Sequence, residues 1–279
     1  MSIPFDSLSD PIVIQAYEEM DNYIIEKVSE KKLAVIYCSS NGIYSPNEYE
    51  IFKKYMYDRN KFEWLKRDWK IENAGLNIYI RDVFKQWHLK GINKEINSID
   101  KLIQFIKEKT VGYEIVTIGS SAGGYIATVL GCKLNAKYVL NFAGQFDLNT
   151  QHSRNTLVHD YIDEDNKYTQ LKYLIESSNT NVFYFVGNNS GVDSRDIQVV
   201  NSIKKNIFLF KYNQSIHGIP FENGCLRVLI QLSQNQLLEL YHKYKGTVIN
   251  RYFFEVYLIG MKNFVNIYTK KIKNKILRS

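Results

Sequence analysis

A short glycine- and serine-rich segment is the first part of the sequence whose residue types and spacing could do chemistry. Residues 119–123 read GSSAG, and they follow the apolar, β-branched run 114–118 and precede a stretch of small apolar residues. Gly-x-Ser-x-Gly between a strand and a helix is the pattern of a nucleophile elbow, a sharp turn that lifts the serine Oγ above a sheet. We therefore predict that Ser121 is a nucleophile and that Gly119 and Gly123 relieve crowding in the turn.

Chemistry at an acyl carbon also needs donors for the oxyanion. The Ala122 N–H begins the predicted helix, where the helix dipole favours negative charge. A second donor is expected from the loop after the predicted strand 33–38, where the Asn41 or Gly42 N–H is available, although a plain Asn-Gly turn explains this dipeptide equally well. A phosphate-binding turn is the alternative to the elbow. Ser120 is the rival nucleophile, but it lacks glycines at both two-residue offsets.

A serine hydroxyl needs a base at neutral pH, and in this type of site the chain order is serine, acid, histidine. His217 lies in a loop just past the predicted strand 207–210, from which its ring can reach the serine. His242 lies within a helical pattern, and His88 precedes the serine and is interpreted as a partly buried polar residue. We therefore predict that His217 is the base.

The acid is expected after the predicted strand 182–186, where the loop carries Asp193 and Asp196. A carboxylate there can hold the histidine Nδ1 and stabilise the imidazolium. Asp193 is favoured as the acid, although it also occupies a helix N-cap position. Asp196 is the alternative, since the first turn of a helix favours an acid for structural reasons alone. Asp147, after the preceding strand, ranks third.

Apolar runs and helix-like spacings alternate along the chain, which predicts an α/β fold with a mostly parallel central sheet flanked by helices. Parallel sheets carry their sites at the carboxyl ends of the strands, where all the residues favoured above are expected. The predicted strands are 33–38, 76–80, 114–118, 137–142, 182–186 and 207–210. The predicted helices are 11–29, 96–106, 125–134, 166–177, 194–204 and 222–243.

The length of 279 residues suits one large domain with a short appendage. We predict a catalytic domain over 1–247, in which the polar segment 148–178 inserts after a strand as a possible cap. Residues 248–279 form a basic, amphipathic helical extension. This extension either lies on a membrane surface or packs on the domain as a final helix, and packing is favoured.

Composition limits the remaining function classes. The formal net charge is +7, but no nucleic-acid-binding motif is evident, so we expect no nucleic-acid partner. The three cysteines, Cys38, Cys132 and Cys225, lack metal-like spacing, so no metal is expected and a reduced, cytoplasmic setting is favoured. The N-terminal residues do not resemble a signal peptide, and no apolar run is long enough to span a membrane.

The elbow, the order Ser121, Asp193, His217 and the loop position of the histidine resemble the α/β-hydrolase superfamily over residues 33–240. Gly-Ser-Ser-x-Gly-Gly, with the tyrosine-, lysine- and asparagine-rich composition, is similar to bacterial capsule-cluster enzymes, some of which are polysaccharide O-acetyltransferases. The resemblance implies an acyl-enzyme and a small-molecule or glycan ester substrate. It implies no cofactor, with acetyl-CoA as co-substrate if the enzyme is a transferase. The competing expectation is a non-catalytic interaction protein on a degenerate hydrolase fold.

Overall fold

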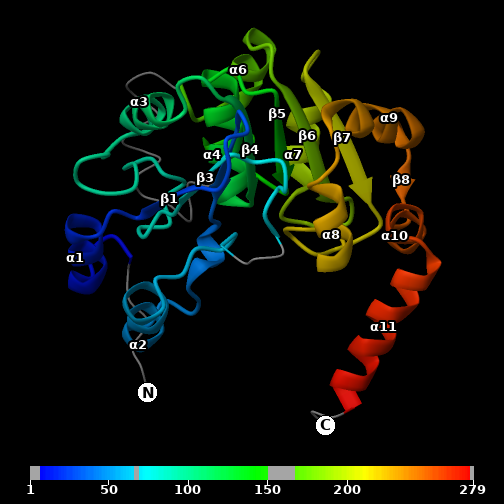
Figure 1. Cartoon of the computed structure of the whole chain (residues 1–279), viewed down its shortest axis with the longest axis horizontal. Coiled ribbons are helices and arrows are strands. Elements are labelled where there is room, and N and C mark those ends of the chain that lie inside the picture. The colour runs from blue at the N-terminus through cyan, green and yellow to red at the C-terminus, as the bar shows by residue number, and fades with distance from the viewer. Residues whose placement is uncertain (1–6, 66–68, 150–166, 277–279) are drawn as a thin grey trace.

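An eight-stranded sheet runs through the centre of the molecule (Figure 1). The structure is a computed structural model that describes residues 7–65, 69–149 and 167–276. Its strands are β1 (Tyr23–Lys27), β2 (Leu33–Cys38), β3 (Leu76–Ile80), β4 (Glu114–Ser120), β5 (Tyr138–Phe142), β6 (Asn181–Gly187), β7 (Ile207–Tyr212) and β8 (Val248–Ile249). The larger helices are α1 (Pro11–Glu19), α3 (Ile99–Lys109), α4 (Ala122–Lys133), α6 (Leu171–Ser177), α7 (Ser194–Asn201), α8 (Asn223–Leu229), α9 (Gln234–Tyr244), α10 (Arg251–Ile259) and α11 (Met261–Ile276). Shorter turns are η1 (Asn41–Ile43), α2 (Tyr49–Lys53) and the π-helical η2 (Lys54–Asp58).

The strand order is β1-β3-β2-β4-β5-β6-β7-β8. Every neighbouring pair is parallel except β1 with β3, which pair antiparallel with Tyr23 opposite Ile80. Strands β4 to β7 lie side by side in chain order with α4, α6 and α7 between them along the chain, as right-handed crossovers require. The predicted α/β class with a mostly parallel sheet is therefore confirmed.

Two apolar layers bury the two faces of the sheet. Alternate residues of β2 face opposite layers, because Ala34, Ile36 and Cys38 belong to one core and Val35 and Tyr37 to the other. The first core is completed by α3, α4, α6 and α7, and the second by α8, α9 and α10. A third cluster joins α1 to α2 and to the loop after β3. Because the central strands are buried on both faces, they read as continuous apolar runs in the sequence.

The single helix predicted over 11–29 is wrong. Helix α1 ends at Glu19, and β1 begins at Tyr23. Met20 already has an extended backbone, and Asn22, whose backbone is left-handed (φ 56°), holds the turn by donating its side-chain amide to the carbonyl oxygens of Ala16 and Ile92. The β-branched residues that follow then pair with β3, a contact across the fold that overrides the helical spacing.

Two other long helical patterns are divided. The helix predicted over 222–243 consists of α8 and α9, because Ser233 starts a new helix with a capping box to Gln236. In the C-terminal segment Gly260, with φ 78°, separates α10 from α11. The division at residue 247 stays a prediction, although the two residues that follow it form β8 at the sheet edge. Most of the possible cap 148–178 lies outside the described residues, and α6 covers its end.

Candidate active site

Ser121 occupies a sharp turn between β4 and α4. Its backbone has φ 54° and ψ −125°, a conformation that a non-glycine residue adopts only under strain, and strain of this kind clusters at functional sites. The Ser121 N–H donates to the carbonyl oxygen of Phe142 in the neighbouring strand β5 (2.8 Å). The turn is thus held at the carboxyl edge of the sheet, as expected of a nucleophile elbow.

The two glycines that flank the turn stand at close backbone approaches. A Cβ on Gly119 would lie 2.1 Å from the Gly123 carbonyl oxygen, and a Cβ on Gly123 would lie 2.2 Å from the Cys38 carbonyl oxygen. Both distances are far shorter than a van der Waals contact between carbon and oxygen, and both oxygens belong to the backbone, so they cannot move aside as a side chain could. The sequence pattern therefore reflects packing of α4 against β4 and β2, and any side chain at these positions would push the helix away from the sheet.

His217 and Asp193 converge on the serine from two neighbouring loops. The His217 Nε2 lies 2.8 Å from Ser121 Oγ, and its Nδ1 lies 2.7 Å from Asp193 Oδ1. The loops after β6 and β7 are tied together, because the Asn189 N–H donates to the Gln214 carbonyl oxygen. The structure thus brings together three predicted residues that stand 96 and 24 positions apart in the sequence.

Asp193 is completely buried, whereas the His217 side chain is 30% exposed. Asp193 occupies the N-cap position of α7, but its side chain makes no capping hydrogen bond. Its second oxygen, Oδ2, has no hydrogen-bond partner in the described part of the chain. The buried carboxylate is therefore directed at the imidazole and not at the helix, an orientation that fixes the histidine tautomer.

Asp196, the alternative acid, faces a different group. Its Oδ1 accepts a 2.6 Å hydrogen bond from the Phe146 N–H, so it holds the loop after β5. Burial raises the pKa of Asp196 to about 7, against the lowering effect of this hydrogen bond, and the nearby Asp193 charge raises it further. Asp147, the third candidate, accepts from the Asn149 N–H. Neither residue makes a hydrogen bond to His217 that the structure records.

The other two histidines that the structure describes, His88 and His242, do not line the cavity at Ser121. His242 is exposed on α9, with its ring 5.9 Å from the ring of Tyr241. His88 is fully buried, deeper than its interpretation as a partly buried residue predicts, and burial lowers its pKa. Its backbone N–H donates to Asp82 Oδ2. His88 therefore belongs to the packing of the loop after β3.

The two proposed loop donors for an oxyanion differ in the structure. The Gly42 N–H donates to the Ser40 hydroxyl (3.1 Å), so it is already engaged, whereas Asn41 lines the cavity at Ser121. The Ser40 N–H is also engaged, by Glu63 Oε2 (2.6 Å). Ala122 is the first residue of α4, where an N–H has no acceptor within its helix. The geometry thus favours Ala122 and Asn41 over Gly42.

A cavity of about 390 Å³ opens at Ser121 and His217. Eight of its ten lining residues have polar side chains, and the ten include three residues from the loop after β3 and one from the loop after β5. The sequence reasoning missed these four. The lining residues are Ser7, Asn41, Asn47, Lys85, Gln86, Trp87, Ser121, Gln145, Val192 and His217.

The loop after β3 is held by one carboxylate. Asp82 accepts hydrogen bonds from the backbone N–H groups of Phe84, Gln86 and His88. Lys85, Trp87 and His88 all have positive φ, so the backbone is tightly coiled around that carboxylate. The Trp87 Nε1–H donates to Gln145 Oε1 (2.8 Å), which joins this loop to the one after β5. In the sequence, the one signal for this loop is an aspartate two residues after the predicted strand 76–80.

Lys85 is the cationic group of this cavity. Its Nζ donates to the Tyr44 carbonyl oxygen and to Asn47 Oδ1 (2.6 Å), and it forms no salt bridge within the described residues. Burial lowers the pKa of Lys85 to about 8. The Lys85 carbonyl oxygen accepts from the Asn41 side-chain amide (3.0 Å), so this residue also positions the loop that carries the Asn41 N–H.

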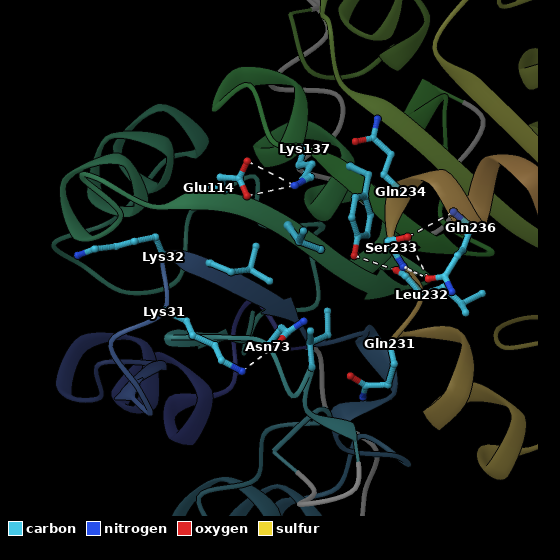
Figure 2. A pocket seen from close by; sticks show the side chains of 14 residues that line it. Lys31, Lys32, Asn73, Glu114, Lys137, Gln231, Leu232, Ser233, Gln234 and Gln236 are labelled. Atoms are coloured by element: carbon cyan, nitrogen blue, oxygen red, sulfur yellow. Dashed lines mark hydrogen bonds and ion pairs between the residues drawn. The ribbon is translucent and has the colours of Figure 1, made fainter.

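A second cavity, of about 470 Å³, lies at the opposite edge of the sheet, where β2, β4 and β5 begin (Figure 2). Several polar side chains at its rim pair with one another: Lys31 donates a hydrogen bond to Asn73, and Lys137 forms a salt bridge with Glu114. No member of the Ser121 site lines it. Among the described residues no group of three or more His, Cys, Asp or Glu side chains is placed to hold a metal ion.

Comparisons with known proteins show similarity of fold. A model of an "Uncharacterised protein family (UPF0227)" matches residues 84–209, and none of the curated proteins matches significantly. A Staphylococcus aureus protein of unknown function is similar in structure at 12% sequence identity; the match covers 79% of this chain and 93% of the S. aureus chain, with a TM-score of 0.51. The Neisseria meningitidis serogroup A capsule O-acetyltransferase matches at 15% identity over 81% of this chain and 90% of its own, with a TM-score of 0.48. An acylaminoacyl peptidase from Pyrococcus horikoshii matches at 10% identity over 81% of this chain and 39% of its own, with a TM-score of 0.44.

The sheet order, the single antiparallel strand β1 and the strand–turn–helix at Ser121 together make this an α/β-hydrolase-type fold. The resemblance predicted from the sequence is confirmed at this level. Within the described ranges, no helix has the length and apolar character needed to cross a bilayer.

Proposed function

We propose that this protein is a serine-nucleophile acyl-ester enzyme that acts through an acyl-enzyme, as an esterase or O-acyltransferase on a carbohydrate substrate such as a surface polysaccharide. The observation that carries the proposal is the continuous hydrogen-bonded chain from Ser121 Oγ through His217 to the buried Asp193. Nucleophile, base and orienting acid in this geometry are the arrangement that activates a serine.

In the first half-reaction His217 Nε2 takes the proton of Ser121 as Oγ forms a bond to the acyl carbon. The negative charge that develops on the carbonyl oxygen is held by the N–H of Ala122, the first residue of α4, and by the N–H of Asn41, a residue that lines the cavity. The bond to the leaving alcohol or thiol then breaks, and the imidazolium returns its proton to that leaving group. The acyl group stays on Ser121.

In the second half-reaction a hydroxyl compound attacks the acyl-enzyme while His217 takes its proton, and Ser121 recovers the proton when the ester bond breaks. Water as the attacking group makes the protein an esterase. A sugar hydroxyl makes it an O-acyltransferase, with acetyl-CoA as the acyl donor that the capsule-enzyme resemblance implies. The three residues do the same work in both cases, so the acceptor distinguishes the two.

The cavity chemistry supports a carbohydrate. Asn41, Asn47, Gln86 and Gln145 line it, and each amide offers both donors and acceptors, as sugar hydroxyls require. Trp87 adds an apolar ring to the same wall, while the Lys85 ammonium adds a cation. Asn41, Asn47 and Gln145 each use one amide atom on the protein, and a small apolar ester would leave the remaining amide atoms without protein or ligand partners, which costs binding free energy.

Ser121→Ala is the direct test. We expect loss of turnover of an acetyl ester by on the order of 10⁴-fold or more, together with loss of labelling by a fluorophosphonate probe. Ser120→Ala is the matched control, because Ser120 adjoins the turn but makes no recorded hydrogen bond to His217. Labelling that survives Ser121→Ala, or a wild-type protein that neither labels nor turns over any ester, would refute the proposal and favour a non-catalytic interaction protein.

Hydrolysis and transfer are separated by following the acyl group. Wild-type protein is incubated with acetyl-CoA, with and without an oligosaccharide acceptor, and the acetylated products are identified by mass spectrometry. An O-acetylated sugar that requires Ser121 identifies a transferase, whereas release of acetate at the same rate with and without acceptor identifies an esterase.

A further inference from the structure

The charge of this chain is concentrated at its end. After Glu255 the sequence contains six basic residues and no acidic residue. The formal net charge of the whole chain is +7, so the remainder is close to neutral. Helix α11 carries most of these cations, and it projects away from the body of the molecule (Figure 1). A helix of this charge offers a surface for an anionic partner.

One face of α11 is firmly attached to the domain. Tyr268 donates its hydroxyl to the fully buried Glu255 (2.8 Å) and accepts from Arg251 (3.1 Å). Lys271 donates to Glu222 (2.6 Å). Ile267 packs so closely on α8 that a Cβ at Gly224 would lie 2.4 Å from its Cδ1. One face of this segment therefore packs on the domain, as the favoured expectation had it.

A neighbouring face of α11 is apolar and exposed. Met261, Val265 and Ile272 are 61%, 50% and 61% exposed. Their spacing of four and seven residues places them along one line of the helix. Lys262 and Lys273 are exposed on the flank of this line. We call Met261, Val265 and Ile272 the apolar stripe.

We propose that α11 lies on an anionic lipid surface, with the apolar stripe entering the boundary between headgroups and acyl chains and the lysines contacting the headgroups. An apolar stripe bordered by lysines, on a helix too short to span a bilayer, is the pattern of an interfacial helix. Because the neighbouring face is bonded to the domain, binding would hold the whole protein at the surface.

Charge separates this partner from the alternatives. A second copy of the chain would bring an equally basic tail against this one, and like charges at short distance repel. A soluble polyanion would bind the lysines but would leave the apolar stripe in water. Only a surface that combines anionic groups with an apolar layer satisfies both features.

The test is flotation of the full chain with vesicles of phosphatidylcholine alone or mixed with phosphatidylglycerol. We expect binding to the mixed vesicles, and weaker binding as salt screens the charges. The charge variant Lys262→Gln/Lys270→Gln/Lys273→Gln should lower the partition coefficient on the order of 100-fold, since each lysine contributes roughly fivefold. Lys271 is kept because it pairs with Glu222.

The stripe variant Met261→Gln/Val265→Gln/Ile272→Gln should also abolish flotation. Matched controls change equally exposed side chains elsewhere, and they should bind as the wild type does. The controls are Lys101→Gln/Lys107→Gln/Lys109→Gln on α3 and the apolar set Val28→Gln/Val111→Gln/Tyr173→Gln.

A second measurement does not depend on the multiple variants. The native cysteines are buried, so a polarity-sensitive dye attaches selectively to Val265→Cys or, as control, to Val111→Cys. Mixed vesicles should shift the emission of the first and leave the second unchanged. The proposal is overturned if wild-type protein does not float, if the α3 control loses binding as the charge variant does, or if the stripe variant binds vesicles normally. Self-association that the stripe variant abolishes, with no vesicle binding, would identify a second copy as the partner.

Discussion

Replacing Asp193 with asparagine removes one charge from the site and little else. The side chain keeps its size, and an amide oxygen can still accept from the His217 Nδ1–H. The carboxylate is completely buried, and its recorded side-chain partner is His217, at 2.7 Å. No second group stands ready to replace its charge, since Asp193 Oδ2 has no partner in the described part of the chain.

The size of the effect follows from this environment. Removing one partner of a buried, hydrogen-bonded charge pair costs about 3–5 kcal/mol. Here the two opposite charges, the Asp193 carboxylate and the His217 imidazolium, coexist only when His217 carries the serine proton. The substitution therefore raises the free energy of the transition state. At about 1.4 kcal/mol for each factor of ten, turnover should drop by roughly 10² to 10⁴. Substrate binding, measured as KM, should change little because Asp193 does not line the cavity.

Steady-state turnover of an acetyl ester is the assay, and Asp196→Asn is the matched control. Asparagine at 196 can still accept from the Phe146 N–H, so its turnover should stay within about tenfold of the wild type. The reasoning is refuted if Asp193→Asn retains wild-type turnover, or if Asp196→Asn is impaired as strongly.

Three further predictions concern the folded state. Gly123→Ala should destabilise the protein by at least about 1–3 kcal/mol, because the new methyl meets the Cys38 carbonyl oxygen; an unchanged urea midpoint would contradict this. Burial raises the pKa of Asp196 to about 7 in the folded state, whereas in the unfolded state the carboxyl loses its proton above about pH 4. The bound proton therefore stabilises the fold fully below about pH 4. Between about pH 4 and 7 this stabilisation is lost, by roughly 1.4 kcal/mol of unfolding free energy per pH unit. Asp196→Asn should remove this slope from the pH dependence of urea unfolding, and parallel profiles would count against it. Burial raises the pKa of the Cys132 thiol to about 11, and all three cysteines are buried, so a disulfide reagent should react after unfolding and not, within minutes, before it.

The strands were predictable because burial on both faces leaves a local signature. The predicted strands 33–38 and 76–80 coincide with β2 and β3, and both consist almost entirely of apolar residues. The region 11–29 failed for the same kind of reason. Its apolar residues fit a helix, but the pairing of β1 with β3, which makes 23–27 a strand, joins residues about fifty positions apart in the sequence, from Lys27 with Leu76 to Tyr23 with Ile80.

The cavity wall was not predictable, because no local pattern marks it. Trp87 and Gln145 meet across 58 positions, and Lys85 bonds to Asn47 across 38. Their roles arise where loops from different strands meet at one edge of the sheet. A polar residue in a loop carries no sign of which other loop it will face.

The sequence alone predicted the turn at Ser121 and the chain order of serine, acid and histidine. Strand, Gly-x-Ser-x-Gly and helix specify a strained serine, because a turn that tight needs glycines where backbones touch. Only the tertiary structure decided which acid faces the histidine. Asp193 and Asp196 are three residues apart and chemically identical, and the loop position that favours Asp193 is also a helix N-cap, so local properties left both open. The paired loops after β6 and β7 place His217 against Asp193, while the loop after β5 presents its backbone N–H to Asp196.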